Sequence, residues 1–310
     1  MTDRAATPDR QPLPLISVII ASVNGLPYIA RCLDALVNQQ GRVDYEVLVV
    51  DCTDASTRSQ LRARFPQPEI RLIEAEGRPS IPKLRALGLA RARGQVIAIL
   101  EDHCNVHPNW LLAIARAHQA GHRAIGGAVE NASIERIIDW AVFFCEYARF
   151  MPPVPRGLVS EITGNNSAYD RRLLDRLGNG LQAEVWESFL HARLRELGAS
   201  FYSEPEMLVF HQKEFGFRYF LSQRYHYSRS FAGMRVREWP WWKRLAYACA
   251  TPLLPPLLLA RMIRTVYKKR RNWREFDLAL PHMVTFLVSW GWGEAVGALL
   301  GPGASLERVE

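Results

Sequence analysis

One stretch of this 310-residue chain constrains its fold more than any other: residues 96–107, Val-Ile-Ala-Ile-Leu-Glu-Asp-His-Cys-Asn-Val-His. Five apolar residues end abruptly in Glu101, Asp102 and His103. Such a run is typical of a buried parallel strand, which delivers polar side chains to the edge of a sheet, where ligands bind in open α/β proteins. Two carboxylates and an imidazole there would suit a divalent metal, although a solvated loop gives the same pattern.

Apolar, β-branched segments alternate with segments of helical spacing over residues 15–129. The expected strands are Leu15–Ala21, Tyr45–Val50, Ile70–Glu74, Val96–Leu100 and Ala124–Val129. The expected helices lie between them, at 27–40, 57–65, 82–93 and 108–118. This alternation predicts an α/β fold with a mostly parallel sheet and helices on both faces. The polar strand ends at Asp51 and Glu101 would then share one edge, where a nucleotide could sit.

The positive charge of the chain is concentrated in one segment. The formal net charge is +8, and residues 239–274 hold nine Lys or Arg and no Asp or Glu, so the remainder is close to neutral. A basic block is typical of a solvated face, a nucleic-acid patch or a membrane-surface anchor. Long apolar runs are interleaved with the basic residues. Nucleic-acid binding does not need such runs, so they argue against a nucleic-acid patch.

The five cysteines are scattered and form no paired motif, which fits a reducing compartment. The first dozen residues are polar and proline-rich, without the apolar core of a signal peptide. We expect three regions: a disordered lead-in over residues 1–13, an α/β domain over 14–235, and a membrane-associated helical region over 236–310.

Four stretches occur in an order and spacing that resemble the inverting family 2 glycosyltransferases: Leu15–Asn24, Val49–Ser56, Gly94–Leu111 and Thr163–Arg171. The resemblance covers residues 14–215 and implies a GT-A (Rossmann-like) fold that binds a nucleoside-diphosphate sugar. The residues that match the family's nucleotide-sugar site are Ala21, Ser22, Asn24, Asp51, Asp54, Arg85, Glu101 and Asp102. Asp51 would accept hydrogen bonds from the base or ribose and Arg85 would pair with phosphate. The alternatives are that Asp51 is only a helix cap or turn residue and that Arg85 is a plain surface arginine.

The family's Asp-x-Asp metal motif corresponds here to Glu101-Asp102-His103, with His103 in the second acidic position. Asp102 becomes the carboxylate ligand if the register shifts by one residue. His211, directly after an expected strand, would complete the metal or diphosphate site unless it is structural. Imidazole ligands shift the preference away from Mg²⁺, so the expected cofactor is a divalent metal, with Mn²⁺ favoured over Mg²⁺.

The resemblance also implies a catalytic base and an acceptor side. The base lies on the helix expected over 184–194, and counting back from Gly198 selects Glu187, with Glu184 one turn earlier in reserve. Such a carboxylate takes the acceptor hydroxyl proton in an inverting transfer, although both acids could simply be exposed. Asn165 and Asn166 match the acceptor-lining stretch, but adjacent Asn residues also form turns. Gln223-Arg224-Tyr225 is only faintly like the Gln-x-x-Arg-Trp motif of processive synthases and supports no prediction.

The C-terminal region combines the aromatic and basic cluster Trp239–Arg244 with two uncharged runs of 16 residues, at 245–260 and 278–293. A spanning helix needs ~20 apolar residues, and three prolines interrupt the first run. If both runs crossed a membrane, the basic loop between them would contradict the positive-inside tendency. We therefore expect peripheral or monotopic helices on the cytoplasmic face of the inner membrane, bound to anionic lipid. A buried helical subdomain and a two-helix hairpin are the alternatives.

The expected function is an inverting, metal-assisted, hexosyltransferase-type enzyme of polysaccharide or cell-envelope synthesis. It would move a sugar from a nucleotide-sugar donor to a membrane-linked glycan or lipid acceptor, without a nucleic-acid partner. The substituted metal motif motivates a second reading, a catalytically inactive homologue that acts as a membrane scaffold or partner subunit.

Overall fold

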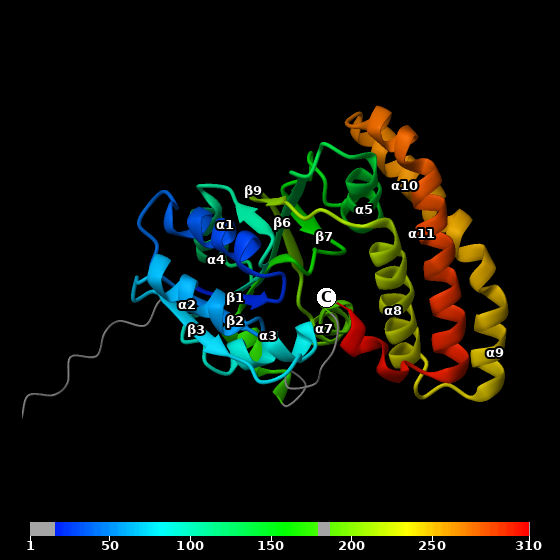
Figure 1. Cartoon of the computed structure of the whole chain (residues 1–310), viewed down its shortest axis with the longest axis horizontal. Helices are drawn as coiled ribbons and strands as arrows, with labels where there is room; N and C mark the ends of the chain where they lie inside the picture. Colours follow the sequence, from blue (N-terminus) through cyan, green and yellow to red (C-terminus); the bar gives the residue numbers. More distant parts are fainter. Residues whose placement is uncertain (1–15, 179–186, 310) are drawn as a thin grey trace, which may run out of the picture.

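The computed structural model describes residues 16–178 and 187–309, so the expected lead-in lies outside the described residues. The strands are β1 (Ile16–Ser22), β2 (Tyr45–Asp51), β3 (Ile70–Glu74), β4 (Val96–Glu101), β5 (Cys104–Val106), β6 (Ala124–Asn131), β7 (Gly157–Val159), β8 (Asn166–Asp170) and β9 (Phe201–His211). The helices are α1 (Leu26–Val37), α2 (Ala55–Arg64), α3 (Ile81–Leu89), α4 (Trp110–Gln119), α5 (Ile137–Tyr147), α6 (Arg171–Asp175), α7 (Glu187–Glu196), α8 (Phe217–Arg235), α9 (Trp241–Ala250), α10 (Leu254–Lys269) and α11 (Trp273–Leu300). Short 3₁₀ turns lie at η2 (Thr251–Leu253) and η3 (Gly303–Arg308). The expected α/β fold is confirmed (Figure 1).

The first half of the sheet is parallel and brings the two polar strand ends together. The strand order is β3-β2-β1-β4-β8-β6-β9-β5, and β3, β2, β1 and β4 are all parallel neighbours. In this register Ser22 lies beside Asp51, and Ala21 lies beside Glu101. The carboxyl ends of β1, β2 and β4 therefore form one edge, as the sequence predicts.

The second half contains an antiparallel strand that the βα alternation does not predict. β8 runs antiparallel to both β4 and β6, and β6 pairs in parallel with β9. The side chain of Asn166 joins these strands: Nδ2 donates to the carbonyls of Ala128 (2.9 Å) and Met207 (2.7 Å), while Oδ1 accepts from Nε1 of Trp110 (2.8 Å). Both polar atoms of this buried amide therefore have partners, so its burial leaves no polar group unpaired.

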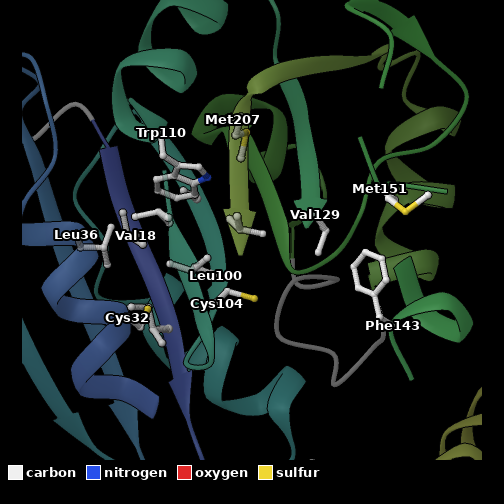
Figure 2. Close-up of a cluster of buried hydrophobic side chains, with 14 of the residues drawn as sticks. Val18, Cys32, Leu36, Leu100, Cys104, Trp110, Val129, Phe143, Met151 and Met207 are labelled. Carbon is white, nitrogen blue, oxygen red and sulfur yellow. The ribbon is translucent and has the colours of Figure 1, made fainter. Parts of the chain in front are cut away.

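Strand alternation divides the apolar side chains between two cores. On β1, Val18 and Ile20 belong to the cluster with α1, α4 and α5, whereas Ile19 and Ala21 belong to the cluster with α3, α6 and α7. Figure 2 shows part of the first cluster, in which Val18 and Leu100 of the strands lie between Cys32 of α1 and Trp110 of α4. Helices thus cover both faces of the sheet, because both faces of its strands are apolar.

The C-terminal helices form a layer beside the sheet domain (Figure 1). α11 packs against α8 and α5, and glycines allow the close approach to α8, since a Cβ on Gly297 would lie 2.3 Å from the carbonyl oxygen of Arg229. Residues 241–269 and 273–300 are long and apolar enough to cross a membrane by length and composition alone. The turn η2, which contains Pro252, interrupts the first of them, as the prolines predict.

Gly127 marks the point where β6 shifts register against β9, and it gives a prediction about the sheet. A Cβ there would lie 1.6 Å from the carbonyl oxygen of Met207 and 2.4 Å from Nδ2 of Asn166. We expect Gly127→Ala to lower the free energy of unfolding by about 3 kcal/mol or more, since a packed backbone must move. Urea unfolding measures this loss.

Gly216→Ala is the matched control, because the nearest atom to its added Cβ is 3.9 Å away, on Tyr219. It should change the same free energy by less than about 1 kcal/mol. Equal stabilities for the two variants would contradict the tight register at Gly127.

Candidate active site

A cavity of about 380 Å³ opens between the sheet edge and the C-terminal helices. Its lining comes from segments far apart in the sequence: α3, the end of β4, α5, the stretch before β8, α7, α8 and α11. Five of the residues predicted from sequence line it: Arg85, Glu101, His103, Asn165 and Glu187. The fold therefore brings predicted residues from separate segments of the chain into one space.

Glu101, His103 and His211 form a compact cluster at the end of β4. Their ligand atoms lie within 4.8 Å of one another. Nε2 of His103 is 3.1 Å from Nε2 of His211 and 3.4 Å from a carboxylate oxygen of Glu101. β9 positions His211 because it pairs antiparallel with β5, which places Cys104 beside His211. Two imidazole nitrogens and a carboxylate that face one another are a donor set suited to a divalent transition metal.

Asp102 faces away from this cluster. Its carboxylate accepts hydrogen bonds from the backbone N–H groups of Val23 (2.8 Å) and Asn24 (2.9 Å) and from Nδ2 of Asn24 (2.7 Å), and it lies 3.0 Å from Nδ1 of His103. The prediction of Asp102 as a metal ligand does not fit this geometry, because β4 ends at Glu101 and the following turn directs Asp102 towards the loop after β1. When His103 is neutral with its proton on Nδ1, donated to Asp102, Nε2 is free to bind a metal beside His211 and Glu101. When His103 is protonated, Nε2 donates to Glu101 instead.

The charges in the cluster depend on one another. Burial lowers the pKa of His211 to about 3, and the nearby charge of His103 adds to this effect. Burial also opposes the charge of His103, but its hydrogen bonds to Asp102 and Glu101 raise its pKa above the ordinary value. Burial alone would raise the pKa of Glu101, yet the hydrogen bond from His103 and the charges around it hold that pKa well below its usual range. Glu101 is thus an anion beside a neutral His211.

Arg85 and Glu187 meet on the opposite side of Glu101. The guanidinium of Arg85 lies 3.6 Å from Glu101 and forms an ion pair with Glu187. Arg85 is largely buried, so it is not a plain surface residue. Glu187 begins α7, and its side chain passes directly over Gly164, where a Cβ would lie 2.7 Å from Cγ of Glu187. Glu184, the reserve choice for the base, lies outside the described residues.

The predicted nucleotide residues lie at the ends of β1 and β2, beside this cluster. Asp51 is fully buried and accepts from Oγ of Ser22 (2.7 Å) and from Oγ1 of Thr53 (2.9 Å), and it pairs with Arg58 (3.3 Å). The helix cap is Asp54 and not Asp51, because Oδ1 of Asp54 accepts from the N–H of Thr57 at the start of α2. At least one carboxylate oxygen of Asp54 is therefore used to cap α2.

The two asparagines proposed for the acceptor side separate in the structure. Asn165 lines the cavity, and its Oδ1 accepts from Oγ1 of Thr163 (2.6 Å). Asn166 points into the sheet, where Trp110, Ala128 and Met207 satisfy its amide. The prediction that Asn166 faces the acceptor does not fit this placement, because β8 begins at Asn166 and its amide bonds inside the sheet, whereas Asn165 precedes the strand.

Other residues of the cavity were not selected from the sequence. Tyr147 donates from its hydroxyl to Glu101 (3.2 Å), and Glu146 and Arg224 form a long ion pair of 3.8 Å. Burial raises the pKa of Glu146 to about 7. In the sequence, only a faint motif with the wrong spacing pointed to Arg224. Glu146 and Tyr147 end the apolar helix α5, and the sequence alone does not show which face of that helix meets the cavity.

An α/β sheet with an acidic, histidine-bearing edge and a helical layer beside it fits a GT-A-like fold. Residues 17–178, just over half the chain, match the family model described as Glycosyl transferase family 2. The chain belongs to this family, as the sequence resemblance predicts.

Curated relatives resemble only part of the chain. The succinoglycan biosynthesis protein ExoO of Rhizobium meliloti (strain 1021) is 32% identical over 123 residues, which is 39% of this chain and 34% of that protein. Polypeptide N-acetylgalactosaminyltransferase 12 of Mus musculus is 30% identical over 143 residues, 44% of this chain and 23% of the relative. The chain thus matches about a third or less of the length of these two relatives.

Solved structures resemble nearly the whole chain in fold. The mannosyltransferase PcManGT from Pyrobaculum calidifontis, in complex with GDP-Man and Mn²⁺, has a TM-score of 0.56 at 18% identity and covers 95% of this chain and 89% of its own. S. aureus TarS 1-349 has a TM-score of 0.51 at 13% identity, covering 91% and 90%. The fold is therefore shared with these solved structures over nearly the whole chain.

Proposed function

We propose that this enzyme transfers a sugar, with inversion, from a nucleoside-diphosphate donor to a membrane-linked glycan or lipid. The observation that carries the proposal is that Glu187 lines the same cavity as Glu101 and His103. This shared cavity supports the proposal that Glu187 acts as a carboxylate base near the group of donors that could hold a metal. The binding of GDP-Man and Mn²⁺ by the similar structure of PcManGT supports a nucleotide-sugar donor and a divalent metal here.

Glu101, His103 and His211 would hold the divalent metal. Two imidazoles favour Mn²⁺ over Mg²⁺, which prefers oxygen ligands. Bound there, the metal would offset the charge that develops on the leaving diphosphate. Asp102 fixes the orientation of His103, a role that carboxylates commonly have behind metal-bound histidines. Because the cluster still offers a carboxylate and two imidazoles to a metal, the alternative of a catalytically inactive scaffold is not favoured.

Glu187 would act as the base for the acceptor. It accepts the proton of the acceptor hydroxyl as that oxygen attacks the anomeric carbon and the bond to the diphosphate breaks. The ion pair with Arg85 holds the carboxylate in one orientation, and the packing over Gly164 limits its movement. Arg85 could also contact the diphosphate, because it lines the cavity beside Glu101.

The nucleotide would occupy the edge formed by β1 and β2. Ala21, Ser22 and Asp51 end these strands, and Asn24 follows in the loop that Asp102 holds. Asp54 contributes through the turn between β2 and α2. On the other side of the cavity, Asn165 would contact the acceptor with its amide.

Glu187→Gln tests the base directly. We expect nucleoside-diphosphate release from the productive nucleotide sugar to fall about 10²–10⁴-fold, because the amide cannot accept the proton. The affinity for UDP or GDP, measured by calorimetry, should stay near the wild-type value. Glu196→Gln, at the exposed end of the same helix, is the matched control and should keep full activity. Near-normal turnover in Glu187→Gln would refute the assignment.

We also propose that residues 14–235 carry the catalytic domain and that residues 236–310 bind the cytoplasmic membrane surface. The exposed tryptophans of this region support the proposal: Trp241 (75%), Trp242 (60%), Trp273 (53%) and Trp292 (66%). Its basic residues would meet anionic lipid. Lys269 and Arg271 are exceptions, because they bind the carbonyls of Met151, Pro152 and Pro153 in the catalytic domain.

Vesicle flotation tests the membrane surface. The protein should float with phosphatidylglycerol vesicles and less with phosphatidylcholine vesicles, and added salt should weaken binding because it screens the basic residues. Changing both Trp241 and Trp242 to Ser should weaken vesicle binding further. Trp239, which is partly buried, stays unchanged in this variant. Equal flotation of the double variant and the wild type would contradict this proposal.

A further inference from the structure

The cavity continues beyond the catalytic cluster into a compartment formed by helices. Glu146 of α5, Arg224 and Tyr227 of α8, and Trp290 of α11 line this part. The turn η3 returns along α8, where Nε2 of Gln223 donates to the carbonyl of Arg308 (3.0 Å). This contact brings Val309 to the cavity wall. The compartment is built by the helical layer rather than by the strand ends that would hold the donor.

Arg224 is held by aromatic rings, and one of its donor atoms has no partner among the described residues. Its guanidinium carbon lies 4.1 Å from the ring centre of Trp290 and 5.8 Å from that of Phe220. The residue is only 8% exposed, and among the described residues Nε has no hydrogen-bond partner. Its carboxylate neighbour, Glu146, is 3.8 Å away, longer than a hydrogen bond. Arg224 nevertheless lines the cavity, so the terminal nitrogens of its guanidinium can donate to a ligand there.

Glu146 supplies acceptors beside these donors. Its side chain is 29% exposed while it lines the cavity. A guanidinium and a carboxyl group side by side can serve two neighbouring hydroxyls, each of which both donates and accepts. The rings of Tyr227 and Trp290 add apolar surface to the same wall. Convergent polar groups on an aromatic wall are the typical composition of a small-molecule site.

The charges of the lining argue for a neutral ligand. The acidic residues of the cavity are Glu101, Glu146, Glu161 and Glu187, and its basic residues are Arg85, Lys213 and Arg224. Arg85 is already engaged with Glu101 and Glu187. Lys213 donates to the hydroxyl of Tyr219 (3.4 Å). A phosphate bound to Arg224 would lie beside the carboxyl group of Glu146, which disfavours an anion there.

We infer that Glu146 and Arg224 form the subsite for a neutral terminal sugar of the acceptor, and that they bind two neighbouring hydroxyls of its ring. This inference rests on the proposed function and narrows it, because it selects a glycan end over a lipid phosphate as the group that enters the cavity. Trp290 acts as a positioning residue that holds the guanidinium in place.

Saturation-transfer NMR on the full chain tests this subsite without any turnover. The neutral probes are the methyl glycosides of glucose, galactose, mannose and N-acetylglucosamine, and the anionic probe is geranyl phosphate. We expect at least one neutral glycoside to bind saturably. Glu146→Gln and Arg224→Gln should each weaken that binding about tenfold or more. Arg224→Lys, which keeps the charge but loses the planar fork, should also weaken it.

Arg218→Gln, an exposed change on the same helix, is the control and should bind like the wild type. The thermal midpoint of each variant reports its folding, and Glu146→Gln and Arg224→Lys remain informative if Arg224→Gln fails to fold. The inference is overturned if no neutral glycoside binds the wild type, if binding survives in Glu146→Gln and Arg224→Lys, or if geranyl phosphate binds and Arg224→Gln abolishes that binding. Calorimetry with UDP and GDP distinguishes a failure of the subsite from a failure of the proposed function. If the protein binds a nucleotide but no glycoside, the subsite alone is refuted. If it binds no nucleotide, the proposed function is refuted.

Discussion

The carboxylate of Asp102 joins the two strand ends on which the site depends. It accepts hydrogen bonds from the backbone of Val23 and Asn24 after β1, and it lies 3.0 Å from the imidazole of His103 after β4. Charge-assisted hydrogen bonds of this kind are stronger than neutral ones, and the buried carboxylate has no alternative partner in water. One side chain therefore fixes the loop beside the proposed nucleotide site and the ring that faces His211.

The rest of the structure builds two walls around this junction. The parallel strands supply the proposed donor side, where Glu101 ends β4 and Asp51 ends β2, the two strands that flank β1. Helices α5, α8 and α11 supply the other side, and α11 reaches α8 closely because Gly293 and Gly297 lack side chains. The cavity between the walls places Glu187 within reach of both. A transferase needs this arrangement, since its base must meet the acceptor while the donor is held in place.

Much of the sheet and its functional edge was predictable from sequence, because buried parallel strands are uninterrupted apolar runs that end in polar residues. Val96–Leu100 showed the strand, but the orientations of Glu101, Asp102 and His103 depended on where β4 ends, which local sequence does not determine. The antiparallel entry of β8 depends on Asn166 meeting Trp110, Ala128 and Met207, residues distant in sequence. Glu146 and Arg224 were missed for the same reason, because their pairing exists only once α5 and α8 have packed.

The central claim is that Glu101, His103 and His211 together hold a divalent metal, while Asp102 orients His103. The most direct measurement is a Mn²⁺ titration followed by electron paramagnetic resonance in the presence of UDP, with the wild type, His211→Ala and the control His122→Ala, whose ring stacks on Tyr202 outside the cluster. We expect the wild type and the control to bind Mn²⁺ alike and His211→Ala to lose affinity about tenfold or more. Unchanged Mn²⁺ affinity in His211→Ala, or no Mn²⁺ binding by the wild type, would contradict the claim.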